Sequence, residues 1–431
     1  MLQWTESSSF QLFQVLRQSA VLLGAILLAN SPLGAQLIGS FELYLFLGTS
    51  LSAFWVNGLI QAFLRVSASL DEIYRRRFLA GAYLVLLLFS GILALFMVFR
   101  GQALADLLGI PVLLPLLPLY ALFLFLNGPA FILEHVLLVE KSSLVLRRYG
   151  VYQSLGYLAA IGLPAYAGMG LAELFGALVC WSLGKHILLW VLFFRDGWPV
   201  PDKRSTIHWL KVALPLVGYA LIGGMHESFD NWLVNYRFAG DPGIFAVYRY
   251  GSRELPLSLV LSTALSTAMI PVLVQNTTDA YDLLRQRSVR LMHLLFPITI
   301  LLLMSSEAWF TLLFSETFSP SIPLFNTLLL VVISRVVFPQ SLMIALGQQK
   351  IMLWVSLAEL LLNVVLSLSL VQLWGLQGII AATLIAYLFE KLVYMGILYL
   401  KFGIKPGAYH NLQLWICYSL ILLAVYAWRI S

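Results

Sequence analysis

Residues 75–100 read RRRFLAGAYLVLLLFSGILALFMVFR. Three arginines come first, then 22 residues without a charged side chain, then one more arginine. At about 1.5 Å per residue, residues 78–99 would form a helix of about 33 Å, which is enough to cross a hydrocarbon core of about 30 Å. This stretch therefore predicts a membrane-spanning helix with a basic end.

The composition of the whole chain agrees with this stretch. Hydrophobic residues make up 61% of the 431 residues and charged residues only 11%, against about 45–50% and about 25% in soluble domains. A water-soluble fold this apolar would have too few polar side chains to cover its surface. The composition predicts an all-α integral membrane protein whose surroundings are membrane lipids.

Apolar runs of spanning length recur along the chain and predict thirteen helices. They cover residues 10–30, 40–64, 78–99, 112–138, 144–168, 170–194, 209–235, 244–274, 288–314, 321–346, 351–373, 376–400 and 413–429. Trp209 and Trp374 lie near predicted span ends, where tryptophan commonly anchors a helix at the membrane interface.

The basic residues predict the orientation of these spans. Of the 26 Lys and Arg residues, 17 fall in the even-numbered loops, and only Arg100 and Arg237 fall in the odd-numbered loops. Because positive residues collect on the cytoplasmic side, the N-terminus is predicted to be cytoplasmic, in a multi-pass protein of the cell inner membrane. The net charge of +6 is therefore a topology signal, and no nucleic-acid partner is expected.

An internal repeat predicts how the spans are organised. Glu140-Lys141, a span and Gly168-Met169-Gly170 are followed 209 residues later by Gln349-Lys350, a span and Gly375-Leu376-Gln377-Gly378. Since six spans separate the copies, both enter the membrane in the same orientation, as parallel repeats do in transporters. We expect two parallel-related six-helix lobes around a central cavity. They would cover residues 1–198 and 199–402, with a thirteenth C-terminal helix in 403–431.

Several short motifs resemble one known family. In the second half they are Ala345-Leu346-Gly347-Gln348-Gln349-Lys350, Asn363, Trp374-Gly375, Gly378 and Ala381-Ala382-Thr383. Earlier ones are Ala213-Leu214-Pro215, Asp230 and Gly240 to Arg249. Their order and spacing resemble the polysaccharide-transporter (O-antigen flippase) branch of the multidrug/oligosaccharidyl-lipid/polysaccharide exporter superfamily. Residues 37–44 depart from that branch's usual Gly-Pro-Glu-x-x-Gly-x-Tyr loop, so the first two spans match more loosely.

This resemblance implies a function as well as a fold. The family's fold is a two-lobed bundle of twelve to fourteen helices. Its activity is alternating-access flipping of an undecaprenyl-diphosphate-linked oligosaccharide from the inner to the outer leaflet. The implied partners are this lipid-linked oligosaccharide and, in the cell, polysaccharide assembly proteins.

Arginines inside the predicted spans are the candidate substrate-binding residues. Arg249 and Arg253 are four residues apart and would share one face of a helix, which Pro256 would bend nearby. Arg17 lies in the first span. A charge at mid-bilayer costs about 2.5–3.5 kcal/mol, so we expect each to face a cavity or a partner. Guanidinium groups pair bidentately with phosphate, which favours a cationic cavity for the lipid diphosphate.

Acidic residues in the spans leave a structural interpretation open. The candidates for charge pairing or ion coupling are Glu227, Asp230, Glu254 and Glu134. Arg249 and Arg253 could simply neutralise the first three, and Arg17 could reach the cytoplasmic headgroups. The remaining charges in the spans are expected to be structural pairs or edge charges: Lys185-His186, Glu307, Arg335, Glu359 and Glu390-Lys391.

Sequence signals of enzymatic chemistry are missing. The chain contains no Gly-x-x-x-x-Gly-Lys-Ser/Thr phosphate loop and no His-Glu-x-x-His, and its two cysteines, Cys180 and Cys417, lie in apolar runs where we expect packed thiols. We therefore expect no cofactor, no metal site and no catalytic residue. Two alternatives to the flippase stay open: an ion-coupled small-molecule antiporter of the same superfamily, and a polysaccharide polymerase-type membrane enzyme. The outer loops are too short for the catalytic loop that such a polymerase needs.

Overall fold

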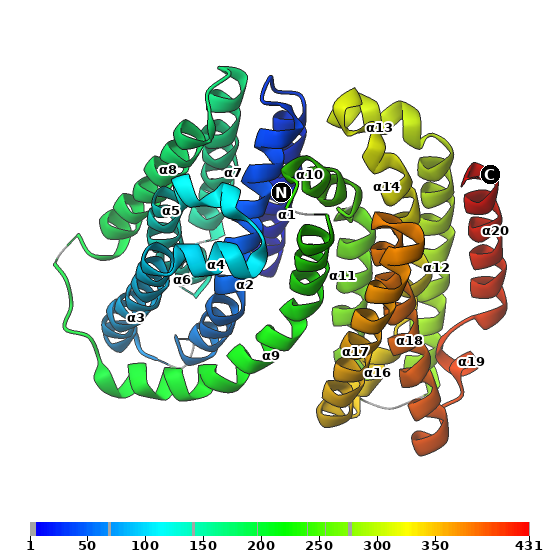
Figure 1. The fold of residues 1–431 in the computed structure, drawn as a ribbon. Coiled ribbons are helices and arrows are strands. Elements are labelled where there is room, and N and C mark those ends of the chain that lie inside the picture. Colours follow the sequence, from blue (N-terminus) through cyan, green and yellow to red (C-terminus); the bar gives the residue numbers. More distant parts are fainter. Residues whose placement is uncertain are drawn as a thin grey trace. The chain divides into compact units, whose positions relative to one another are not determined.

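The computed structural model describes residues 6–67, 70–139, 143–195, 197–238, 240–254, 256–274 and 278–430, which are helical apart from short connections (Figure 1). The chain forms two compact units, Met1–Ala246 and Val247–Ser431. Each unit is described separately below.

The first unit contains nine α-helices, one 3-10 helix (η1) and the start of α10 among its described residues. They are α1 (Glu6–Ala29), α2 (Gly34–Ser67), α3 (Glu72–Phe99), α4 (Gly101–Leu108), η1 (Pro111–Leu116), α5 (Leu117–Ala130), α6 (Ile132–Val139), α7 (Ser143–Tyr166), α8 (Leu171–Phe193), α9 (Lys203–Arg237) and α10 (Pro242–Gly251).

The second unit continues from α10 to the C-terminal helix. Its elements are α11 (Pro256–Leu273), α12 (Thr278–Met304), α13 (Ser306–Phe314), the 3-10 helix η2 (Glu316–Ser321), α14 (Ile322–Leu329), α15 (Val332–Arg335), α16 (Pro339–Ala345), α17 (Gln349–Trp374), α18 (Leu376–Phe402), α19 (Pro406–Tyr409) and α20 (Leu412–Ile430).

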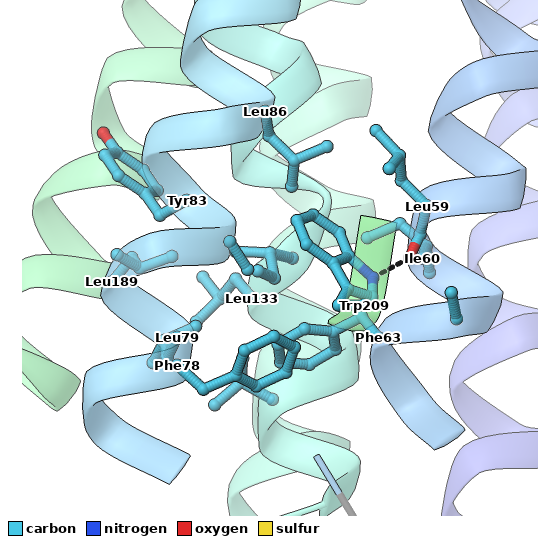
Figure 2. Packing of buried hydrophobic residues seen from close by; sticks show 14 of the residues in the cluster. Leu59, Ile60, Phe63, Phe78, Leu79, Tyr83, Leu86, Leu133, Leu189 and Trp209 are labelled. Carbon is cyan, nitrogen blue, oxygen red and sulfur yellow. Dashed lines mark hydrogen bonds between the residues drawn. The ribbon is translucent and has the colours of Figure 1, made fainter. Parts of the chain in front are cut away.

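Aromatic packing joins α9 to the core of the first unit (Figure 2). Trp209 of α9 is fully buried, and its Nε1 donates a hydrogen bond to the Leu59 carbonyl oxygen of α2 at 2.9 Å. Phe63 and Phe78 stack with ring centroids 5.3 Å apart, and Phe78 meets the edge of Trp209 at 5.8 Å. Trp209 lies near the start of α9, as predicted, but its side chain packs inside the protein and does not face the lipid headgroups. A buried tryptophan needs an acceptor for its N–H, and the Leu59 carbonyl provides one.

The division into units follows the packing of α9. This 35-residue helix, which contains Pro215 and is visibly bent in Figure 1, packs along α2 within the first unit. The lobe boundary between residues 198 and 199 follows from the sequence repeat and not from packing, and it stays a prediction.

The multi-span helical architecture is confirmed. Eleven helical stretches among the described residues are long and apolar enough to cross a membrane. They include Leu412–Arg429 in α20, so the predicted C-terminal span is an apolar helix of spanning length. Two of the thirteen predicted spans are not among the eleven. One is 144–168, which forms the 24-residue α7 but contains no stretch as apolar as those of the eleven; the other is 244–274.

The predicted span 244–274 is interrupted. Helix α10 ends at Gly251, and α11 begins at Pro256. Proline is favoured at the first position of a helix, where no N–H is needed, so Pro256 begins a new helix instead of bending a continuous one. Arg253 lies in the connection, and the prediction that it shares a helix face with Arg249 is therefore wrong.

Two other predicted spans are also divided. The span 288–314 is split at Ser305 between α12 and α13, and the span 321–346 is split into α14, α15 and α16. Cys180 and Cys417, expected as packed thiols, are both exposed on their helices.

Candidate functional site

An ion pair inside the first unit connects two residues that the sequence singled out separately. Arg17 of α1 donates to Glu134 Oε1 of α6 at 2.9 Å and to Gln14 Oε1 at 2.8 Å. The Glu134 side chain is 4% exposed and that of Arg17 is 30% exposed. His135 Nδ1 lies 3.5 Å from the same carboxylate oxygen. Arg17 is thus held by a buried carboxylate.

A cavity of ≈ 150 Å³ lies beside this pair, between α1, α5, α7 and α8. Lys185 of α8 lines it and is 5% exposed. Its Nζ donates to Asn127 Oδ1 at 2.5 Å and lies 5.8 Å from the centre of the Phe131 ring. The cavity therefore has two basic side chains on its wall, Arg17 and Lys185. Its lining residues are Arg17, Ala20, Val21, Phe123, Asn127, Phe131, Gln153, Ser154, Tyr157, Leu178, Trp181 and Lys185.

In the second unit, Glu254 is bound by an arginine far along the chain. Arg335 Nε donates to Glu254 Oε1 at 3.0 Å, and its second nitrogen donates to Oε2 at 2.6 Å. This is the bidentate geometry in which arginine binds a carboxylate most strongly. Ser258 donates to the same carboxylate at 3.2 Å. Arg335 also lies over the Tyr387 ring, 5.4 Å from its centre.

The other predicted residues lie on α9, on α10 or in the connection after α10. Arg249 is half-buried on α10, and Arg253 is half-buried in the connection after it, 5.5 Å from the centre of the Tyr250 ring. Asp230 of α9 is 6% exposed. Glu227 is on the same helix, but its side chain lies outside the described residues.

A second polar network of this unit joins α16, α17 and α18. Lys391 pairs with Glu390 at 2.8 Å and is also hydrogen-bonded to Gln340. Tyr394 donates to Glu390 Oε1 at 3.0 Å. Glu359 of α17 is 5% exposed and interacts electrostatically with Glu390 and Lys391. These charges behave as the structural pairs that were predicted, as does Glu307, which pairs with Arg429 at 2.8 Å.

Lys185 and Arg335 were both expected to be structural or edge charges. Arg335 is such a structural pair, because it binds Glu254, whereas Lys185 also lines a cavity. The sequence did mark both residues, because each lies in the middle of a predicted span, where an ionisable residue is usually functional. No group of three or more His, Cys, Asp or Glu side chains in the described part of the chain is placed to hold a metal ion.

The fold and these buried charges define a class: a multi-span helical membrane protein with the fold of multidrug/oligosaccharidyl-lipid/polysaccharide (MOP) superfamily transporters. The chain belongs to the family described as Polysaccharide biosynthesis protein, whose sequence pattern matches residues 49–323. The family resemblance found in the motifs is therefore confirmed. No curated protein sequence matches the chain.

Three solved structures illustrate the shared fold. The lipid II flippase MurJ in an inward closed conformation superposes with a TM-score of 0.68 at 16% identity, over 96% of this chain and 91% of MurJ. An inward-facing multidrug resistance MATE family transporter gives 0.63 at 14%, over 98% and 99%. A MOP superfamily transporter from Pyrococcus furiosus, whose binding pocket is described as having reverse polarity, gives 0.58 at 14%, over 97% and 94%. At these identities the similarity concerns the fold alone.

Proposed function

We propose that this chain is an alternating-access flippase. Its substrate would be an undecaprenyl-diphosphate-linked oligosaccharide, moved across the cell inner membrane for the assembly of O-antigen, capsule or exopolysaccharide. Support comes from a polysaccharide biosynthesis family membership combined with a transporter fold. A family that builds polysaccharide has use for a transporter only if an intermediate must cross the membrane.

The observation that carries the proposal is the interrupted helix at α10 and α11. Non-helical backbone within a membrane span is tolerated only where it is buried in protein or lines a cavity. Transporters use such interruptions to build substrate and ion sites. Here the interruption includes Arg253 and Glu254, and Arg249 lies half a turn before the helix ends. Both oxygens of Glu254 accept hydrogen bonds from Arg335, which fastens the segment to α15.

The charge of the substrate suits these residues. A diphosphate carries its negative charge on several phosphate oxygens. The planar guanidinium group of arginine can donate two hydrogen bonds to such oxygens at once. We assign Arg249 and Arg253 to the diphosphate. Arg17, the third cationic residue predicted from the sequence, is paired with Glu134 inside the first unit. Asp230, Glu227, Glu254 and Glu134 would be their charge partners while the site is empty, or would couple an ion to transport.

Leaflet translocation tests the proposal directly. Purified protein would be reconstituted into proteoliposomes with a radiolabelled undecaprenyl-diphosphate oligosaccharide, and its appearance in the opposite leaflet would be followed. We expect wild type to move the lipid and Arg253→Ala and Arg249→Ala to slow it at least about tenfold, the equivalent of about 1.4 kcal/mol. The matched control is Arg429→Ala, which removes an arginine from an ion pair whose glutamate, Glu307, is 71% exposed; we expect it to retain the wild-type rate.

Other outcomes assign the chain differently. If wild type moves no lipid-linked sugar while an ion gradient drives small cations across, the antiporter alternative replaces the flippase. If the two arginine variants fold and transport like Arg429→Ala, the assignment of the diphosphate site is wrong.

A further inference from the structure

Two residues that line the cavity of the first unit each carry a buried hydrogen-bonding group without a partner. Trp181 Nε1 and Ser154 Oγ both belong to residues that line it, and neither atom has a hydrogen-bond partner in the described part of the chain. Ser154 is 8% exposed. Buried donors are nearly always satisfied, and an unsatisfied pair in one cavity indicates an unseen water or ion.

The charge of the cavity favours an ion over water. Glu134 neutralises Arg17, at 2.9 Å. Lys185 has its contacts with an amide oxygen and an aromatic ring, and it forms no ion pair with a described carboxylate. Glu134 also acts electrostatically on Lys185, so this one carboxylate faces two basic side chains, and the cluster keeps one excess positive charge. Such a charge within the membrane is costly unless an anion accompanies it.

We propose that this cavity binds one chloride-sized monovalent anion. Lys185 Nζ, Trp181 Nε1 and Ser154 Oγ would donate to it, and a single negative charge would bring Arg17, Glu134 and Lys185 together with the anion to neutrality. Since a water molecule takes about 30 Å³, a cavity of ≈ 150 Å³ has room for a halide and a few waters. It has no room for a lipid-linked oligosaccharide. This site is separate from Arg249 and Arg253 and does not depend on the proposed flippase function.

Chloride binding by the purified full-length protein tests the site. Chloride would replace gluconate at constant ionic strength, with the thermal midpoint and the linewidth of ³⁵Cl nuclear magnetic resonance as the two readouts. We expect a saturable rise in the midpoint, as for any ligand of the folded state, and line broadening that bromide displaces. Trp181→Phe keeps the ring and removes the donor, and Ser154→Ala removes only the hydroxyl. Each should weaken chloride binding about tenfold, the usual order for one charge-assisted hydrogen bond.

Matched variants separate binding from general effects. Trp190→Phe changes an exposed tryptophan of the same helix. Ser182→Ala removes a buried hydroxyl that also lacks a described partner but does not line the cavity. Both should bind chloride as wild type does. Lys185→Met should abolish chloride binding. If this variant does not fold, the comparison of Trp181→Phe with Trp190→Phe still tests the site.

Three results would overturn the proposal. The absence of any saturable chloride effect would mean that the cavity holds water only. Equal changes in chloride binding in Trp181→Phe and Trp190→Phe would mean that the anion binds outside this cavity. Stabilisation by inorganic phosphate or diphosphate but not by chloride would make the cavity a phosphate site. Because translocation by Arg253→Ala is measured separately, failure of the anion site and failure of the flippase proposal can be told apart.

Discussion

Glu254 and Arg335 form the pair whose energetics follow most directly from geometry. Their side chains are 17% and 27% exposed, and the carboxylate lines a small apolar cavity together with Leu295 and Leu328. Removing one partner leaves the other charge uncompensated, which costs more than the pair itself contributes. We expect Arg335→Met to lower the free energy of unfolding by about 2 kcal/mol, between the values for membrane hydrogen bonds and for buried ion pairs.

The double variant Glu254→Gln/Arg335→Met checks this reasoning. It removes both charges, so it should recover most of the stability that Arg335→Met loses, as measured by chemical unfolding in detergent. Losses that simply add would mean that the two residues act independently. The partly exposed pair Glu307–Arg429 serves as the reference, and Arg429→Ala should cost less than about 1 kcal/mol.

His410 introduces a pH dependence outside the membrane spans. It follows α19 and is 1% exposed, with Nδ1 3.3 Å from Ser288 Oγ and its ring against Trp415. Burial, and secondarily the positive charge of Arg285, lowers the pKa of His410 to about 4. The unfolded chain takes up a proton near pH 6.5 but the folded chain does not. The contribution of His410 to the free energy of unfolding is therefore fully present above about pH 7. It is lost as the pH falls from 6.5 toward 4.

The size of this loss is up to about 3 kcal/mol. Thermal midpoints of wild type and His410→Gln between pH 7.5 and 4.5 would measure it. Wild type should lose stability over this range more steeply than the variant. Parallel curves would show that His410 is not the group that titrates.

At the scale of elements, Gly58 sets the distance between α2 and α9. A Cβ atom at Gly58 would lie 2.6 Å from the backbone nitrogen and Cα of Val217, which cannot move aside as a side chain can. Small residues at such points let membrane helices approach closely. We expect Gly58→Ala to push the two helices apart and to lower the unfolding free energy by about 1–3 kcal/mol.

Gly176 of α8 is the matched control for this substitution. It is also helical, but a Cβ atom there would meet nothing within 4 Å. Alanine is the better helix former, so Gly176→Ala should be neutral or stabilise by up to about 1 kcal/mol. Equal effects of the two substitutions, measured as shifts of the unfolding midpoint, would contradict a close contact at Gly58.

Long uninterrupted helices could be predicted from sequence because run length alone decides them. The predicted spans 351–373 and 376–400 differ from α17 and α18 by at most two residues at each end, and the span 78–99 ends where α3 ends but begins six residues later. The interruption after Gly251 could not be predicted in the same way. Pro256 is compatible with a bend or with a new helix, and the contact that fastens the segment comes from Arg335, 81 residues away from Glu254.

The candidate site shows the same limit. Charges in the spans mark Arg17 and Glu134 as unusual, but only the fold reveals that these two residues, 117 positions apart, pair with each other. The cavity with Lys185 also depends on four helices meeting, which no local pattern of residues encodes.

For the whole molecule, the open question is whether α7 crosses the membrane. Its 24 residues extend about 36 Å, which exceeds a hydrocarbon core of about 30 Å. The helix is less apolar than its neighbours for a local reason: Gln153, Ser154 and Tyr157 line the cavity. We therefore expect it to be a span, with its polar side directed inward, and the orientation predicted from the basic loops to hold on both sides of it.

Labelling with a membrane-impermeant maleimide decides this. In a background with Cys180 and Cys417 replaced by serine, single cysteines would be placed at Met169, between α7 and α8, and at Val200, after α8; both positions are exposed. If α7 crosses and the N-terminus is cytoplasmic, intact cells should be labelled at position 169, and position 200 only after permeabilisation. If α7 does not cross, both positions change sides, since α8 still crosses. A reference cysteine at the exposed Phe99, at the end of α3 and before α7, separates this result from a reversed N-terminus. If Phe99 is labelled in intact cells and positions 169 and 200 show the inverse pattern, α7 is not a span and every loop after it is reversed.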